Sequence, residues 1–203
     1  MAIAAVIAAA GLSARMRDFK PLLRLGHSTV IRHTIDVLKG AGAEHILVVT
    51  GYQSVVLERH LLLPGVMFLK NERFAQTDML TSIQLGLSAL PSGVERVFVT
   101  PADVPLVSPM TLRQMLLAKA QVVRPLYHGR GGHPILLDRH AVGQVLAWTG
   151  SGGLKGLLGA GALEVAAVET DDPGILMDAD TPQDYKRLLA YQARLQGRGN
   201  PRM

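Results

Sequence analysis

The first residues whose types suggest chemistry form a short loop of small and positively charged side chains. Residues 9–16 read AAGLSARM, and Lys20 follows four residues later. The small residues let backbone N–H groups approach phosphate oxygens closely, and Ser13 adds a hydroxyl group. Arg15 and Lys20 supply positive charge that backbone dipoles alone lack. This composition predicts an anion-binding loop that suits phosphate groups.

Two well-known phosphate-binding motifs do not account for the loop. No Gly-x-x-x-x-Gly-Lys-Ser/Thr sequence occurs in the chain, and Gly11 stands alone, which excludes the Gly-x-Gly-x-x-Gly dinucleotide fingerprint. A simpler alternative stays open, in which Gly11 makes a tight turn after a strand and the two cations are solvated surface charges. The residue types alone favour that alternative.

Alternating strand and helix patterns must position this loop. Short apolar runs alternate with segments of helical periodicity, and turn residues separate them, which is typical of an open α/β sheet. The predicted strands are 3–8, 45–50, 66–69, 96–100, 121–125 and 163–168. The predicted helices are 29–39, 53–62, 79–90, 109–118, 139–148 and 181–195. Ligands of such sheets bind at the carboxyl ends of the strands, so the chemistry is expected in the loops that follow them.

The loop resembles the opening signature of the MobA-like nucleotidyltransferase family. That signature reads Ala-Ala-Gly-x-Ser-x-Arg-Met-Gly-x-x-Lys, and the resemblance extends from residue 3 to about residue 189. It implies a three-layer, Rossmann-like α/β fold with a mostly parallel, mixed sheet. It also implies that Arg15 and Lys20 hold a nucleoside triphosphate and act catalytically, while the Ala-Ala-Gly backbone meets base and ribose. Arg17 stands where the family usually has glycine.

Aspartates in two distant segments are the candidate metal ligands. Asp103 lies in the sequence PADVPLV, where a proline-bounded turn explains it as well as a metal does. Mg²⁺ prefers oxygen ligands, usually one or two carboxylates together with phosphates. The family's Asp-x-Pro-Leu and Asp-x-Asp-Thr-Pro-x-Asp segments are similar to the sequences here, which implies Mg²⁺ bound by Asp103 with Asp178 or Asp180. Asp184 is expected in the first turn of a helix, where a carboxylate favours the helix dipole.

An asparagine and a serine complete the implied nucleotide site. Segment 71–86 resembles the family's Asn-rich loop and its Ser-x-x-x-Gly helix start, in which Ser82 would meet the nucleotide. Taken alone, Ser82 is better explained as a helix-start residue. The nucleotide-binding residues that the resemblance implies are Ala9, Ala10, Gly11, Ser13, Arg15, Lys20, Asn71 and Ser82.

The acceptor side is predicted from a glycine-rich segment, YHGRGGHP at 127–134. It is similar to the family's Gly-x-x-Gly-His-Pro segment, which lines the acceptor site, whereas a flexible hairpin is the alternative. The implied acceptor-binding residues are Arg130, Gly132 and His133. An arginine suits an anionic acceptor, while a structural role and an acid–base role stay equally open for His133. In segment 150–156, Ser151 replaces the family's usual acid and Lys155 its arginine.

The activity that the resemblance implies is transfer of a nucleoside monophosphate from an NTP to an acceptor phosphate or hydroxyl, with release of pyrophosphate. The two alanines before Gly11 resemble the cytidylyl-transferring branch, which favours CTP as donor and molybdopterin as acceptor. The alternatives are a guanylyltransferase, a nucleotidyltransferase for a sugar phosphate or alcohol, and a degenerate nucleotide-binding domain without activity. Fusion to, or contact with, another enzyme domain also stays open.

Composition narrows the remaining classes. The chain has a net charge of +5, yet Lys and Arg are scattered and aromatic residues are few, so no nucleic acid is expected as a partner. No apolar run is long enough to span a membrane, and there is no cysteine, so we expect a cytoplasmic protein without membrane association. Residues 1–196 are expected to form one domain, followed by a flexible tail at 197–203.

Overall fold

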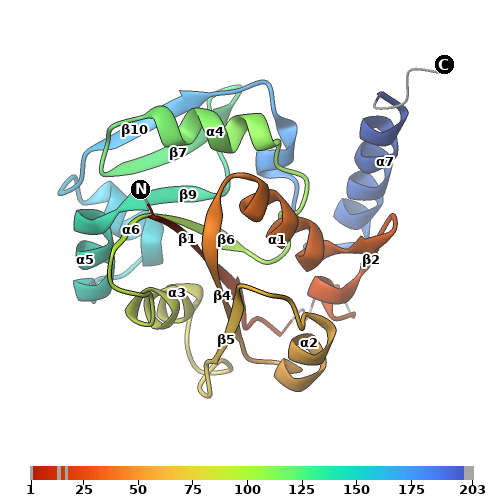
Figure 1. Cartoon of the computed structure of the whole chain (residues 1–203), viewed down its shortest axis with the longest axis horizontal. Helices are drawn as coiled ribbons and strands as arrows, with labels where there is room; N and C mark the ends of the chain where they lie inside the picture. The colour runs from red at the N-terminus through yellow and green to blue at the C-terminus, as the bar shows by residue number, and fades with distance from the viewer. Residues whose placement is uncertain (1, 13–14, 17, 199–203) are drawn as a thin grey trace.

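The structure, a computed structural model, describes residues 2–12, 15–16 and 18–198 of the 203-residue chain. A mixed sheet lies at its centre, with helices on both faces (Figure 1). In spatial order its strands are β10 (Val165–Glu169), β7 (Val122–Tyr127), β9 (Ile135–Asp138), β6 (Val94–Pro101), β1 (Ala2–Ala9), β4 (Ala43–Thr50) and β5 (Val66–Lys70), and β8 (Arg130–Gly131) pairs with β7. The helices are α1 (Val30–Gly40), α2 (Ser54–His60), α3 (Met79–Ser88), α4 (Pro109–Leu117), α5 (Arg139–Ala147), α6 (Gly153–Gly159) and α7 (Pro182–Arg198).

Most strands of the central sheet run in the same direction. β1 pairs in parallel with β4 and β6, β4 with β5, and β10 with β7, whereas β9 is antiparallel to both β6 and β7. The register places Ala8 opposite Pro101 and Ala9 opposite Thr50. The loops after β1 and β6 therefore leave the same edge of the sheet side by side. The predicted Rossmann-like, mostly parallel mixed sheet is confirmed.

Burial on both faces explains why the central strands read as continuous apolar runs. Along β1, Ala5 and Ile7 face the cluster formed with α1, α2 and α4, whereas Ala4 and Val6 face the cluster formed with α3, α5 and α6. Side chains alternate between the faces of a strand, so each helix layer receives every second residue. The three layers expected of the family are thus present.

A glycine in α3 allows this helix to approach the sheet closely. A Cβ atom at Gly86 would lie 2.5 Å from Val6 Cγ1 and 2.9 Å from Val49 Cγ2. No side chain fits there without displacing the helix or the strands. Because Ser82 lies one turn earlier on α3, this close packing also fixes where Ser82 meets the edge of the sheet.

The six predicted strands and six predicted helices all occur, with ends that differ by a few residues. The sequence patterns missed several shorter elements, among them the antiparallel strand β9 with its short neighbour β8, and helix α6. β9 is only four residues long and directly follows the glycine-rich segment 127–134, for which a flexible hairpin was the alternative to an acceptor site. Helix α6 has the sequence GLKGLLG, whose three glycines hide its periodicity.

Helix α7 stands at one side of the molecule beside a small hairpin, β2 (Arg24–Leu25) with β3 (Ser28–Thr29), which follows the short helix η1 (Lys20–Leu22) (Figure 1). Leu188 of α7 is buried against Leu25, and the Gln192 amide donates to the Leu25 carbonyl at 3.1 Å. α7 continues to Arg198, past the residue at which we placed the end of the domain, so the domain boundary stays a prediction. Among the described helices, none combines the length and apolar composition that crossing a membrane requires.

Candidate active site

Two cavities adjoin at the carboxyl ends of the strands. The carboxylate cavity, of about 380 Å³, lies between the loops after β1 and β6, the start of α3 and the segment before α7. Its lining includes ten predicted site residues, Ala9, Ala10, Gly11, Arg15, Lys20, Ser82, Asp103, His133, Asp178 and Asp180. The apolar cavity, of about 750 Å³, lies between the sheet, α3 and α6. The two cavities share Met79, Pro101 and His133 on their walls.

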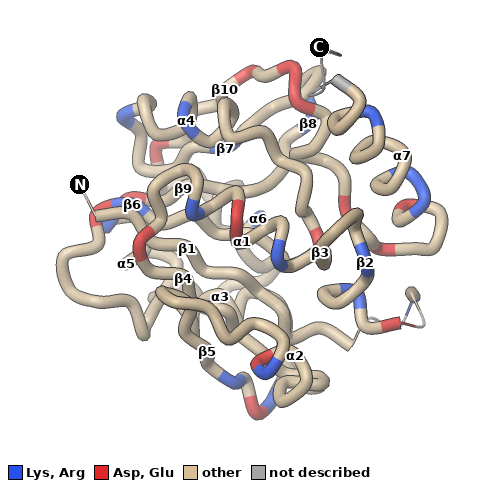
Figure 2. The backbone as a smooth tube through the Cα atoms, turned by 45° about the vertical axis from the view of Figure 1, so that its right-hand side comes forward, with Lys and Arg blue, Asp and Glu red and all other residues tan. Residues whose placement is uncertain are grey.

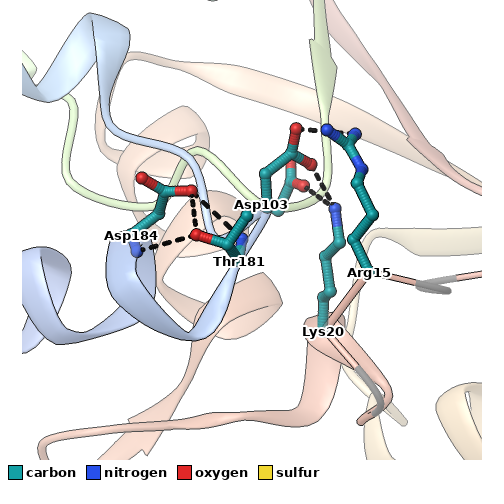
Figure 3. Close-up of polar contacts among 6 residues, drawn as sticks. Arg15, Lys20, Asp103, Thr181 and Asp184 are labelled. Carbon is teal, nitrogen blue, oxygen red and sulfur yellow. Dashed lines mark hydrogen bonds and ion pairs between the residues drawn. The ribbon is translucent and has the colours of Figure 1, made fainter.

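A lysine joins the two acidic segments of the carboxylate cavity. Lys20 Nζ donates to Asp103 Oδ2 at 3.0 Å and to Asp180 Oδ1 at 2.5 Å. Arg15 Nη2 lies 2.8 Å from the other oxygen of Asp180. Figure 3 shows Arg15 and Lys20 extending side by side from the first loop toward these carboxylates. Residues that were predicted from three separate motifs therefore meet within hydrogen-bonding distance.

Backbone contacts hold the three loops together. The N–H of Ala102 donates to the carbonyl of Ala8 at 3.0 Å, which ties the loop after β6 to the end of β1. The N–H of Ala179 donates to the carbonyl of Asp103 at 3.2 Å, which ties the segment before α7 to the same loop. The position of Asp180 is thus fixed by its immediate neighbour.

The start of α7 is capped by a reciprocal pair of residues. Thr181 N–H donates to Asp184 Oδ2 at 3.1 Å, and Asp184 N–H donates to Thr181 Oγ1 at 3.2 Å (Figure 3). Such a pair satisfies backbone donors that the first helical turn leaves unpaired. Asp184 therefore lies in the first helical turn, as predicted, while Asp178 and Asp180 precede the helix and line the cavity.

Charge coupling shifts the pKa values in this cavity in opposite directions. Burial opposes the charged form of Lys20, but Asp103 and Asp180 outweigh it and raise the pKa of the lysine. Burial likewise opposes ionisation of Asp180, but Lys20 and then Arg15 lower the pKa of that carboxyl group. Burial first, and then the charges of Asp180 and Asp103, raise the pKa of Asp178. The two aspartates that sequence alone left equivalent thus differ electrostatically.

A buried asparagine positions Ser82 from behind. The Asn71 side-chain amide donates to Ser82 Oγ at 3.1 Å and to Thr77 Oγ1 at 2.9 Å, while its oxygen accepts from the Arg73 N–H at 3.0 Å. Ser82 lines the carboxylate cavity, whereas Asn71 lies beneath it. The helix-start role belongs to Asp78, whose carboxylate accepts from the Thr81 N–H at 2.9 Å.

The predicted acceptor residues separate into two groups. Gly132 lines the apolar cavity and His133 lines both cavities, but Arg130, which lies in the described part of the chain, lines neither. A Cβ at Gly132 would lie 2.3 Å from the Ile175 carbonyl oxygen, so only glycine permits this backbone approach. The His133 N–H donates to the same carbonyl at 2.9 Å.

His133 carries an unsatisfied ring nitrogen. Its Nδ1 atom is buried and has no hydrogen-bond partner among the described residues. Burial lowers the pKa of His133 despite the nearby negative charge of Asp103, which favours the neutral form of the ring. A neutral imidazole between two cavities can accept or donate one hydrogen bond to a bound molecule.

Two cations on the wall of the apolar cavity were not selected as site residues from sequence. Arg124 comes from β7 and Lys155 from α6. For Lys155 the available signal was its place in segment 150–156, where it replaces the family's arginine. For Arg124 the signal was a single arginine within the apolar run VVRPLY, since a charged residue inside a buried strand calls for an explanation. Ser13 and Arg17 of the first loop lie outside the described residues.

The donor atoms of the carboxylate cavity suit a metal that is shared with phosphate. In the described part of the chain, no cluster of three or more His, Asp or Glu side chains has the spacing of a metal site. Asp103 and Asp180 nevertheless converge on one cationic group, the Lys20 ammonium. Magnesium characteristically uses one or two carboxylates and completes its shell with water and substrate phosphates. The residues therefore fit a cation bound together with a triphosphate.

The charge distribution elsewhere is mixed. Figure 2 shows basic and acidic residues dispersed over several elements, rather than gathered on one face of the tube. A nucleic-acid interface would require a basic patch or stripe. The basic residues that Figure 2 marks in the described chain form no such patch.

Comparisons with known proteins show the family to which the chain belongs. The family model of the MobA-like NTP transferase domain matches residues 5–168. The molybdenum cofactor cytidylyltransferase of Escherichia coli is 30% identical over 188 residues, which cover 91% of this chain and 94% of that protein. A nucleotidyl transferase from Methanothermobacter has a TM-score of 0.83 and 27% identity, covering 96% of this chain and 99% of its own. Rv0371c from Mycobacterium tuberculosis, solved in complex with manganese, has a TM-score of 0.75 and 26% identity over 94% and 98% of the two chains. Together with the fold and the geometry of the cavity, these matches show that the chain is a nucleotidyltransferase of the MobA-like NTP transferase family.

Proposed function

We propose that this enzyme transfers CMP from CTP to an anionic small-molecule acceptor, with molybdopterin as the leading acceptor, and that the triphosphate binds in the carboxylate cavity. The observation that carries the proposal is the junction of Lys20 with Asp103 and Asp180 beside the Ala9–Gly11 backbone. The similarity to the Escherichia coli cytidylyltransferase supports cytidine as the base and molybdopterin as the acceptor.

The reaction is an in-line displacement at the α-phosphorus. An acceptor phosphate or hydroxyl oxygen forms the new bond to phosphorus, the bond to the bridging oxygen breaks, and pyrophosphate leaves with that electron pair. If the acceptor is a hydroxyl, its proton passes to solvent. Such transfers depend on positioning and on neutralisation of charge, and they need no side-chain nucleophile.

The residues of the cavity have separable roles in this proposal. Arg15 and Lys20 bind the triphosphate oxygens, and the Ala-Ala-Gly backbone and Ser82 contact the nucleoside. Asp103, with Asp178 or Asp180, would hold a divalent cation, for which Mg²⁺ is the leading candidate. The cation would neutralise negative charge on the phosphates. Because Lys20 contacts the carboxylates in this structure, a bound triphosphate must draw the lysine toward its own oxygens.

The test is a pyrophosphate-release assay with each NTP in turn, Mg²⁺ and molybdopterin. We expect release with CTP and molybdopterin together, and loss of release in Asp103→Asn. Release with GTP instead would identify a guanylyltransferase, and release only with a sugar phosphate would identify a different acceptor. NTP binding that is unaffected by Asp103→Ala, without turnover by the wild type, would instead indicate a non-catalytic nucleotide-binding domain.

A further inference from the structure

The apolar cavity carries two cations without partners. Within the described part of the chain, neither Arg124 nor Lys155 has a hydrogen-bond or ion-pair partner. No Asp or Glu is found among the described residues that line this cavity. The lining therefore carries two positive charges and no carboxylate, and this favours an anionic ligand.

The position of Arg124 is set by the alternation of β7. Val122 is buried against the α3, α5 and α6 layer and Val123 against the opposite layer, so Arg124 returns to the α3 and α6 side. A Cβ atom at Gly131 would lie 3.3 Å from Arg124 Cζ, so the guanidinium group lies directly against the Gly131 backbone. Arg124 is half-buried, and a half-buried guanidinium without a partner is costly until an anion pairs with it.

Most of the remaining wall is apolar and offers room for a ring. Ile83, Val99, Ile135, Leu154 and Leu158 surround the two cations. The volume of about 750 Å³ is within the range of pockets that enclose most of a small molecule. A ligand made only of phosphate would leave this apolar surface in contact with water.

The cavity also opens toward the site of the chemistry. Met79, Pro101 and His133 lie on its wall and on the wall of the carboxylate cavity. A molecule held in the apolar cavity can therefore present an oxygen atom to a triphosphate in the carboxylate cavity. Arg130 is excluded from this arrangement because it lines neither cavity.

We propose that Arg124 and Lys155 bind a phosphate group of the acceptor, and that the acceptor has an apolar, ring-sized body that packs against α3, α6 and β9. This proposal rests on the proposed function, since it assigns the acceptor side of the same reaction. Arg124 and Lys155 form no covalent bond in the reaction. They determine which acceptors bind and how they are oriented, and they replace Arg130 as the expected anion clamp.

A ring-bearing phosphate monoester, 1-naphthyl phosphate, probes the site directly in calorimetry. We expect binding to weaken about tenfold or more in Arg124→Gln and in Lys155→Gln, because each change removes a charge-assisted contact. Arg130→Gln removes the same charge from the neighbouring hairpin and is expected to bind as the wild type does. Arg124→Lys keeps the positive charge and should retain more of the affinity than Arg124→Gln does. Because Lys155 is exposed, substitutions of Lys155 test the proposal without disturbing the core.

Three binding results would overturn the assignment. One is an affinity for 1-naphthyl phosphate that falls as much in Arg130→Gln as in Arg124→Gln. Another is inorganic phosphate binding as tightly as 1-naphthyl phosphate, which would show that the apolar part of the ligand contributes nothing to binding. The third is loss of the probe in Lys20→Gln alone, which would place it in the carboxylate cavity.

The proposed function has a separate outcome. The Arg124→Gln/Lys155→Gln double variant separates the two proposals. If it releases pyrophosphate from CTP with an unchanged KM for molybdopterin, the acceptor-binding role of Arg124 and Lys155 is wrong and the proposed function is retained. If no NTP gives pyrophosphate release while binding of 1-naphthyl phosphate still depends on Arg124, the proposed function is wrong and the anion-binding role of Arg124 is retained.

Discussion

Lys20 Nζ lies 2.5 Å from Asp180 Oδ1, although the two residues are 160 positions apart in the sequence. The same ammonium group also contacts Asp103, so one protein cation pairs with two carboxylates that are the proposed metal ligands. A lysine and a divalent cation compete for such oxygens when no triphosphate is present. The contact therefore predicts an order of events, in which nucleotide releases Lys20 from the carboxylates and the metal then binds.

Lys20→Met is expected to bind Mn²⁺ about tenfold more tightly than the wild type in the absence of nucleotide, because Asp103 and Asp180 both lose the positive charge of Lys20 and Asp180 keeps only that of Arg15. The same variant is expected to bind CTP more weakly. Calorimetric titration with Mn²⁺, with and without CTP, measures both effects. Lys70→Met is the matched control, since Lys70 pairs with Glu72 at the surface, outside the carboxylate cavity. An unchanged or weaker Mn²⁺ affinity in Lys20→Met contradicts the competition.

The pKa values of Asp178 and Asp180 shift in opposite directions, so removing the two charges by substitution should change the free energy of unfolding in opposite directions. The pKa of Asp180 is lowered from 3.8, so its ionisation stabilises the fold above that pH, and the contribution is lost as pH falls through the folded-state pKa. The pKa of Asp178 is raised from 3.8, so its ionisation costs stability above the folded-state pKa and costs nothing below 3.8.

Urea unfolding at several pH values between 3 and 7 tests this difference. At pH 7, Asp180→Asn is expected to lower the free energy of unfolding and Asp178→Asn to raise it. Both differences should shrink toward zero as the medium becomes acidic. The two variants are each other's control, because both remove one charge from the same short segment. Changes of the same sign in both would show that the Lys20 and Arg15 contacts do not separate the two carboxylates.

The fold was largely predictable because its central strands and covering helices have clear local patterns. The alternation of strand and helix patterns was readable, and all six predicted strands and all six predicted helices occur. Strand β9 was not predicted because four residues carry little periodicity and because its antiparallel direction depends on pairing with β6 and β7. Such pairing is a tertiary property that no local pattern encodes.

Sequence motifs identified several candidate site residues, and the ends of the parallel strands bring their loops together. Arg15, Lys20, Asp103 and Asp180 were selected from separate segments, and they meet in one cavity. The motif around Arg130 named an arginine that lines neither cavity, whereas Arg124 of β7, which pairs with β8, lines the apolar cavity, so the role of Arg130 stays a prediction. Which arginine of a hairpin faces a pocket depends on register, and sequence spacing alone does not fix the register.

Gly86→Ala is expected to lower the free energy of unfolding by about 1–3 kcal/mol, because the added methyl group overlaps Val6 and Val49. It should also raise the KM for the nucleotide, since α3 carries Ser82 into the carboxylate cavity. Gly143→Ala provides the control within α5, where an added Cβ meets nothing within 4 Å. That substitution is expected to stabilise the protein by roughly 0.5–1 kcal/mol through helix propensity. Equal effects of the two substitutions in thermal and urea unfolding would rule out the close packing of α3 as the cause.

Asn71 is expected to act on the nucleotide through Ser82 and not by direct contact. Asn71→Ala removes the donors to Ser82 Oγ and Thr77 Oγ1 and the acceptor for Arg73 N–H, and it should lower the free energy of unfolding by about 1–3 kcal/mol. Ser82→Ala removes only the hydroxyl group, so a smaller loss of stability is expected.

A double-mutant cycle on CTP affinity separates the two modes of action. If Asn71 works by orienting Ser82, the loss of affinity in Asn71→Ala/Ser82→Ala should be close to that of Ser82→Ala alone, and the coupling energy should be about 0.5 kcal/mol or more. Additive losses would mean that Asn71 contacts the nucleotide independently, after a rearrangement of the loop that now covers it. Thr77→Val serves as the control, because it removes a partner of the same Asn71 amide while leaving the bond to Ser82 in place. Its effect on CTP affinity should be smaller than that of Ser82→Ala, since the position of the serine hydroxyl is then still fixed from beneath.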